Sequence, residues 1–178
     1  MKTYLTYGSA MAGGGFVLVM VLYILGLHSD PDKLSIAQWV QTIIGLGISI
    51  TCIVLGTKTR RSQVPPAEEF SYGSALGAGV MISVFASLIG IATTYLYAGV
   101  INPGFVDVLL QAQANKLEAS GLSADKIEQI QSVSAIWMKP AVQSALSFVF
   151  GVIFGTIVSL ITAAFLKRSA SEIPPVVA

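Results

Sequence analysis

Long stretches of this chain carry no charged residue, and that absence decides its class. Lys, Arg, Asp and Glu make up only 11% of the 178 residues, against about 25% in soluble domains. None of them falls within residues 3–27, 34–57, 70–106 or 140–166. Each stretch reaches the roughly 20 apolar residues that cross a bilayer core about 30 Å thick. In hydrocarbon the backbone must satisfy its own hydrogen bonds, so each stretch is expected to be a transmembrane helix.

Other residue types are scarce, which excludes several function classes. The single cysteine, Cys52, excludes an intrachain disulfide and a cysteine metal cluster. The net charge of +1 offers no basic surface for nucleic acid. The apolar stretches hold no ionisable residue of the kind that marks catalytic or proton-relay sites in membranes. The only histidine, His28, lies in a turn with Asp30 and Asp32, where ordinary loop chemistry is expected rather than a metal site. We therefore expect no catalytic residue, no metal and no cofactor, and a protein that is not an enzyme.

The predicted fold is an all-α integral membrane protein with a left-handed bundle of four transmembrane helices. Residues 1–168 form a single domain, with helices at about 4–27, 35–56, 72–100 and 140–166. Residues 169–178 are small, polar and proline-containing, and are expected to be a flexible cytoplasmic tail. The triplet Ala10-Met11-Ala12 resembles a signal-peptide cleavage site, but it precedes the strongest apolar run instead of following it. The first helix is therefore expected to be retained.

Residues 101–139 are expected to form an amphipathic helical hairpin between the third and fourth spans. Asn102 is predicted to cap its first helix, with Pro103 at the first helical position. Gly121 suits the left-handed position after a helix end, and Ser123 can cap the second helix. The hairpin is too polar to cross and is expected on the outer surface, with Trp137 at the headgroups. Two roles remain open for it, a docking surface or a solvated linker.

Basic residues predict the orientation of the chain. Six lie on one side of the membrane, including every arginine: Lys2, Lys58, Arg60, Arg61, Lys167 and Arg168. Four lie on the other: Lys33, Lys116, Lys126 and Lys139. Both termini are therefore expected in the cytoplasm and the hairpin outside it, with the inverted topology as the alternative.

A short internal similarity suggests a tandem repeat of two helices. Tyr7-Gly8-Ser9-Ala10 recurs as Tyr72-Gly73-Ser74-Ala75, and both copies open a helix that runs outward. Two parallel helix pairs would then be related by a pseudo-two-fold axis along the membrane normal. Chance similarity between glycine-rich apolar segments is the alternative.

Small residues at helical spacing are the best physical clue to how the helices pack. Of the 17 glycines, only Gly104 and Gly121 lie outside the apolar segments or their ends. Small residues spaced four apart let helix backbones approach closely. The residues predicted to pack in this way are Gly8, Gly73, Gly77, Gly79, Ser147, Gly151, Gly155 and Ser159. Packing within one bundle explains part of this pattern, and other transmembrane helices are the second kind of expected partner, besides the lipid bilayer.

These observations favour a protein that acts by helix–helix association, as a homo-oligomer or as an accessory subunit of a membrane complex. The alternative is a small channel or carrier for a neutral or weakly polar solute, lined by hydroxyl groups of the third and fourth helices. Serine and threonine hydroxyls in membrane helices also serve in packing, which is their commoner use.

Three segments carry a resemblance to a known family. They are residues 98–105 (Ala-Gly-Val-Ile-Asn-Pro-Gly-Phe), residues 121–128 (Gly-Leu-Ser-Ala-Asp-Lys-Ile-Glu) and the Gly-x3-Gly-x3-Ser-Leu-Ile row that ends at Lys167. The chain resembles, over nearly its whole length, the bacterial membrane-protein family catalogued as domain of unknown function 4199. The resemblance implies four transmembrane helices and a bacterial inner membrane. It implies no activity, ligand or functional residue.

Overall fold

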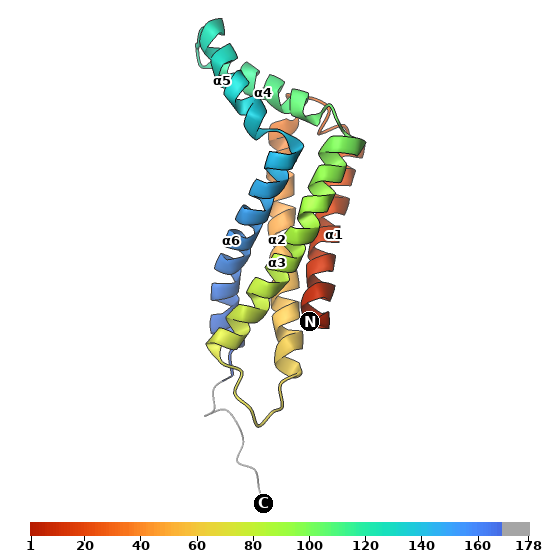
Figure 1. Ribbon diagram of the computed structural model, residues 1–178, viewed down its shortest axis with the longest axis vertical. Helices are drawn as coiled ribbons and strands as arrows, with labels where there is room; N and C mark the ends of the chain where they lie inside the picture. The colour runs from red at the N-terminus through yellow and green to blue at the C-terminus, as the bar shows by residue number, and fades with distance from the viewer. Residues whose placement is uncertain (169–178) are drawn as a thin grey trace, which may run out of the picture.

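The computed structural model describes residues 1–168, and these residues are helical almost throughout. Four long helices run side by side (Figure 1): α1 (Lys2–Ile24), α2 (Leu34–Ser62), α3 (Tyr72–Leu96) and α6 (Pro140–Leu166). A π-helical segment, η1 (Tyr97–Ile101), continues α3, and α4 (Phe105–Ala119) and α5 (Ala124–Trp137) form a hairpin. The four long helices are apolar enough to cross a membrane, so the predicted all-α membrane fold is confirmed. The predicted tail, 169–178, lies outside the described residues.

The connections lie at two opposite ends of the helices. The start of α1, the α2–α3 linker and the end of α6 share one end, and the α1–α2 turn and the hairpin share the other (Figure 1). We call these the linker end and the hairpin end. The α4–α5 hairpin leans away from the long helices beyond the top of α6 (Figure 1). The two groups of basic residues predicted on opposite sides of the membrane therefore lie at or beyond opposite ends of the four helices.

Helices α1 and α4 are each followed by a glycine with a positive φ angle. After α1, Gly26 adopts a φ of 72°, and the Leu27 N–H donates to the Leu22 carbonyl at 3.0 Å. After α4, Gly121 adopts a φ of 78°, and the Leu122 N–H donates to the Leu117 carbonyl at 3.3 Å. Both ends are Schellman motifs, which favour glycine because other residues are strained at positive φ. The prediction for Gly121 is confirmed.

The hairpin starts later than the sequence suggested. The prediction that Asn102 caps its first helix is wrong, because α4 begins at Phe105 after Gly104. The Asn102 N–H instead donates to the Tyr97 carbonyl at 2.7 Å, a five-residue spacing that belongs to the π-helical turn. The second hairpin helix begins as predicted, with Ser123 at its N-cap position.

Helix α2 extends past its expected end at Gly56 and continues to Ser62. No proline or glycine follows Gly56 before Pro65, so nothing local stops the helix earlier. Arg60 and Arg61 lie in its last turn, where their positive charges interact favourably with the helix dipole and stabilise the helix end.

The closest helix pair is α3 with α6, which run antiparallel along a row of small residues. Gly79 faces Ser159, Gly155 faces Ser83, and Gly151 faces Ser87, as the atoms nearest to each glycine show. Each step of four residues along one helix matches a step of four along the other. We call this row the α3–α6 seam. A β-carbon at Gly79 or Gly155 would collide with the serine opposite, so the backbones pack at a distance that only glycine allows.

Burial is uneven along the helices. The described residues include two buried apolar clusters, Ile53 with Ile82 and Val158, and Phe70 with Ala75 and Ala163. Both lie toward the linker end. Buried residues are absent from the middle of three helices, at positions 9–21 of α1, 38–52 of α2 and 145–154 of α6. The middle of α1 and of α2 is therefore loosely packed, whereas α3 keeps buried residues at its middle, where it meets α6 along the α3–α6 seam.

Arg168 fastens the end of α6 to the α2–α3 linker. Its backbone exchanges two hydrogen bonds with Phe70, at 2.8 and 3.1 Å. Its guanidinium donates to the carbonyls of Pro65 and Glu68 at 2.8 and 2.7 Å. Phe70, only 2% exposed, is thereby held against Ala75 and Ala163. The non-helical linker is ordered because its carbonyls have a cationic partner.

A leucine at Gly155 is expected to destabilise the fold. The new side chain must displace Ser83 across the seam, and overpacking of this kind costs about 1–3 kcal/mol. The matched control is Ile157→Leu, an apolar exchange on the same helix at a residue 52% exposed. Thermal unfolding in mild detergent should show a lower midpoint for Gly155→Leu alone. Equal midpoints for the two variants would mean that the α3–α6 seam does not hold the helices together.

Candidate functional site

Five of the eight residues predicted for helix packing lie at tight contacts between helices: Gly8, Gly79, Gly151, Gly155 and Ser159. Four of them belong to the α3–α6 seam. Gly8 lies where α1 crosses α3, and a β-carbon there would be 2.7 Å from Phe85 Cβ and 3.0 Å from the Ala86 nitrogen. The tightest contacts of α3 therefore lie on two sides of the helix, toward α6 and toward α1.

The other three predicted packing residues, Gly73, Gly77 and Ser147, are exposed in the described chain. A β-carbon at Gly77 would meet no atom within 4 Å, and one at Gly73 would meet only the Ser71 hydroxyl oxygen at 3.8 Å. Gly77 is two residues from Gly79, which is about 200° around an α-helix. Gly73 and Gly77 therefore face away from the α3–α6 seam.

The buried serines of the seam satisfy their hydroxyl groups locally. Ser83 donates to the Gly79 carbonyl at 3.0 Å, and Ser159 donates to the Gly155 carbonyl at 2.6 Å. Both serines are 0% exposed. A buried hydroxyl without a partner would be costly, and a backbone carbonyl one turn back is the nearest acceptor. These hydroxyls therefore belong to the packing of the seam.

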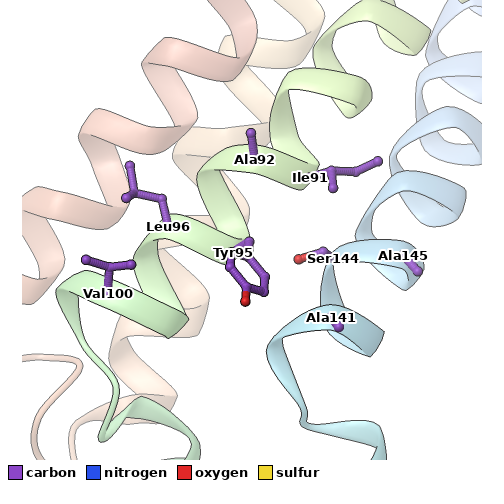
Figure 2. Close-up of a pocket in the computed structure, with 8 residues that line it drawn as sticks. All are labelled: Ile91, Ala92, Tyr95, Leu96, Val100, Ala141, Ser144 and Ala145. Atoms are coloured by element: carbon purple, nitrogen blue, oxygen red, sulfur yellow. The ribbon is translucent and has the colours of Figure 1, made fainter.

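Toward the hairpin end, the seam opens into an apolar groove between α3 and α6 (Figure 2). Its volume is about 710 Å³, and its walls are formed by Ile91, Ala92, Tyr95, Leu96, Val100, Ala141, Ser144 and Ala145. The row of small residues on α3 ends at Ser87, and its next members at the same spacing are Ile91 and Tyr95. These large side chains cannot enter a glycine-sized gap, so the helices separate. The same separation explains why Ser147 is exposed.

A buried polar cluster lies at the hairpin end, where the α1–α2 turn meets η1. His28 Nδ1 is 2.6 Å from the Tyr97 hydroxyl, and the Asn102 side-chain nitrogen donates to that hydroxyl at 3.1 Å. His28 is only 3% exposed, and Tyr97 and Asn102 are also buried. Phe105, the first residue of α4, stacks near both rings, with centroids 5.0 Å from His28 and 5.4 Å from Tyr97. We call these four residues the histidine cluster.

Burial favours the neutral form of His28, and the hydrogen bonds of the histidine cluster are compatible with that form. The Tyr97 oxygen accepts a hydrogen bond from Asn102, so its own hydrogen is free to point at His28 Nδ1. Nδ1 then acts as the acceptor, which is the role it has in the neutral ring protonated on Nε2. Burial favours the same state and lowers the pKa of His28 below its ordinary value. The cluster therefore ties the α1–α2 turn, η1 and α4 together around an uncharged histidine.

Sequence reasoning missed the histidine cluster. It assigned His28 to ordinary loop chemistry, and it assigned Asn102 to a helix cap. A signal was present, because a lone histidine follows the first span, Tyr97 lies in the last turn of the third, and Asn102 and Phe105 follow it, all at the same end of the helices. Within residues 1–168, no three His, Cys, Asp or Glu side chains gather as a metal site would require.

We expect the free energy of unfolding to fall when His28 is protonated. The folded pKa is lowered, so the unfolded chain binds more protons between that value and about pH 6.5. Stability should be full above about pH 6.5 and decrease as the pH falls through this window. Of the two acids in the turn, Asp30 pairs with Lys33 at 3.0 Å, and the hydrogen bond from Lys33 lowers the pKa of Asp30, so Asp30 titrates at lower pH. Thermal unfolding in detergent between about pH 8 and pH 5 measures the effect.

Two variants separate the contributions of the cluster. His28→Gln should flatten the pH dependence, whereas Tyr97→Phe should lower stability at every pH, because it leaves His28 and Asn102 without their shared partner. An unsatisfied buried group typically costs about 1–3 kcal/mol. A wild-type protein whose unfolding midpoint is constant over this pH range would contradict the assignment of a buried neutral His28.

Comparison with known proteins identifies the family of the chain. No curated protein and no solved structure matches the chain. One protein family matches the chain, under the description "Protein of unknown function (DUF4199)". The match covers residues 6–168, which include nearly all of the four long helices, the hairpin, the groove and the histidine cluster. The expected resemblance is confirmed, and the chain belongs to the DUF4199 family.

Proposed function

We propose that this protein acts by association of its transmembrane helices, as a homo-oligomer or as an accessory subunit of a membrane complex, without enzymatic activity. The observation that carries the proposal is the outward position of Gly73 and Gly77 on α3. Both are exposed, they lie one turn apart on one face, and a β-carbon at Gly77 would meet no atom of another helix within 4 Å. Two glycines at this spacing let the backbone of a second helix approach closely, which is how many membrane helices associate.

The loose middle of the bundle gives the proposal independent support. A β-carbon at Gly13, Gly15, Gly45 or Gly47 would meet no atom of another helix within 4 Å. In a single helix, a glycine costs about 1 kcal/mol relative to alanine. Inside the α3–α6 seam, this cost is offset by close packing of the two backbones. At these four open positions on α1 and α2, nothing in the described chain offsets the cost, and a neighbouring helix would.

A solute pathway is the second candidate, and the packing of the hydroxyl groups gives it less support. Ser83 and Ser159 are buried in the seam and hydrogen-bonded to their own helices, so they line no open space. Ser49 and Ser87 border a cavity of about 160 Å³ among α1, α2 and α3. A pathway through that cavity would need further helices to enclose it, so it too depends on association.

Replacing Gly77 with leucine is expected to weaken the oligomer and leave the single bundle intact. The new side chain faces away from the other helices of the chain, but it would separate two backbones that meet at Gly73 and Gly77. Size-exclusion chromatography with light scattering in mild detergent should show a smaller particle, and the unfolding midpoint should not decrease.

The matched control is Gly90→Leu. This change makes the same exchange on the same helix, also into open space, but Gly90 has no glycine one turn away. It should leave both the particle size and the midpoint unchanged. If Gly77→Leu keeps the wild-type particle size, the face containing Gly73 and Gly77 is not the contact between chains.

We further propose that the linker end lies in the cytoplasm of a bacterial cell, with the protein in the inner membrane. The excess of basic residues at that end, including every arginine, supports this orientation. Single cysteines at exposed Ser62 and Ser120, each on a Cys52→Ser background, would report the two sides. A membrane-impermeant thiol reagent should label Ser120→Cys in intact cells and Ser62→Cys only after lysis. The reverse pattern would mean the inverted topology.

A further inference from the structure

The groove between α3 and α6 lies in the membrane-spanning part of both helices. Its residues run from Ile91 to Val100 on α3 and η1, and from Ala141 to Ala145 on α6, next to the hairpin end (Figures 1 and 2). The ten residues from Ile91 to Val100 extend about 15 Å along the helix. A groove of this length inside the bilayer is surrounded by hydrocarbon, so its natural occupant is a hydrocarbon chain that runs along the helices.

The walls of the groove suit such a chain. The α6 side contributes Ala141, Ala145 and Ser144, whose small side chains leave room between the helices (Figure 2). The Ser144 hydroxyl donates to the Pro140 carbonyl at 2.7 Å, so it presents no free donor to the groove. On the α3 side, Ile91 and Leu96 add branched apolar surface. The interior of the groove is therefore apolar.

Polar chemistry appears only at the hairpin end of the groove. Tyr95 projects from α3 toward α6, and its hydroxyl makes no hydrogen bond to another described residue (Figure 2). Lys139 is exposed, directly precedes α6 and lies two residues before Ala141 in the groove wall. Within residues 1–168, the only ion pair joins Asp30 and Lys33, so no carboxylate is in ion-pair contact with Lys139. An apolar groove with a cation and a hydroxyl at its headgroup end matches an anionic phospholipid in both parts.

The geometry points to a binding site for one anionic phospholipid, with an acyl chain in the α3–α6 groove and the phosphate near Lys139 and Tyr95. This site is separate from the face containing Gly73 and Gly77, which lies at the opposite end of α3. Lipid binding at this site is therefore a separate property, which the proposed association of helices does not require.

Native mass spectrometry of the full chain, with phosphatidylglycerol and phosphatidylcholine as probes, tests the site. Wild type should retain phosphatidylglycerol in preference to phosphatidylcholine. Ala145→Phe puts a ring in the groove and should lower phosphatidylglycerol retention about fivefold or more. The matched control is Ala164→Phe, the same change at another exposed alanine of α6, which should retain the lipid as wild type does. Unfolding midpoints of both variants establish that each is folded.

The headgroup contact has its own variant. Lys139→Gln should reduce the preference for phosphatidylglycerol about fivefold, the effect of one lysine at a membrane surface, and leave phosphatidylcholine retention unchanged. Lys126→Gln, an exposed lysine on α5, is its control and should have no effect. Equal lipid retention by Ala145→Phe and Ala164→Phe would overturn the site. The site would also be overturned if the wild type held no lipid and the Ala145→Phe variant lost the oligomer, since a second copy of the chain would then occupy the groove. A wild type without preference between the two lipids would overturn the anionic headgroup.

Discussion

The backbone contact between α3 and α6 is the constraint on which the rest of the structure depends. Gly79, Gly151 and Gly155 each face a serine of the other helix, and the antiparallel register repeats every four residues. Hydrocarbon gives helices no hydrophobic reason to associate, so close van der Waals contact must supply the attraction. That contact requires a glycine on one helix at each point where the backbone of the other helix comes close. Gly8 allows the same close contact between α1 and α3. Helix α3 therefore makes close backbone contacts with both α1 and α6.

The small-residue row of α3 ends at Ser87, and this explains the groove between α3 and α6 toward the hairpin end. After Ser87, the positions of α3 that continue the row are Ile91 and Tyr95, and the two helices separate. The groove is the result of that separation. The chain is tied again at the hairpin end by the histidine cluster, where His28, Tyr97 and Asn102 share hydrogen bonds in a buried site. The molecule therefore has a close contact at the middle of α3 and α6, hydrogen bonds of the histidine cluster at the hairpin end, and looser packing between them.

This division places the two proposals on different surfaces with different chemistry. Association between chains rests on glycines that face outward, where a partner backbone would supply the contact that the chain itself lacks. Lipid binding rests on a groove that the chain forms between its own helices, with charge at one end. Neither surface includes the histidine cluster, which holds the base of the hairpin with an uncharged ring. A change in one of these three parts need not change the others.

The sequence by itself determined the four spans, because hydropathy and the absence of charge are local properties of each segment. It also determined the helix end at Gly121 and the start at Ser123, which depend on the backbone preferences of single residues. It identified the small-residue rows, but not which row faces which helix, because the rotation of a helix about its axis is set by its neighbours. Gly77 and Gly79 looked alike in the sequence and lie on nearly opposite sides of α3. Only the tertiary structure brought His28 to Tyr97, because their contact joins residues 69 positions apart, and no local pattern encodes that distance.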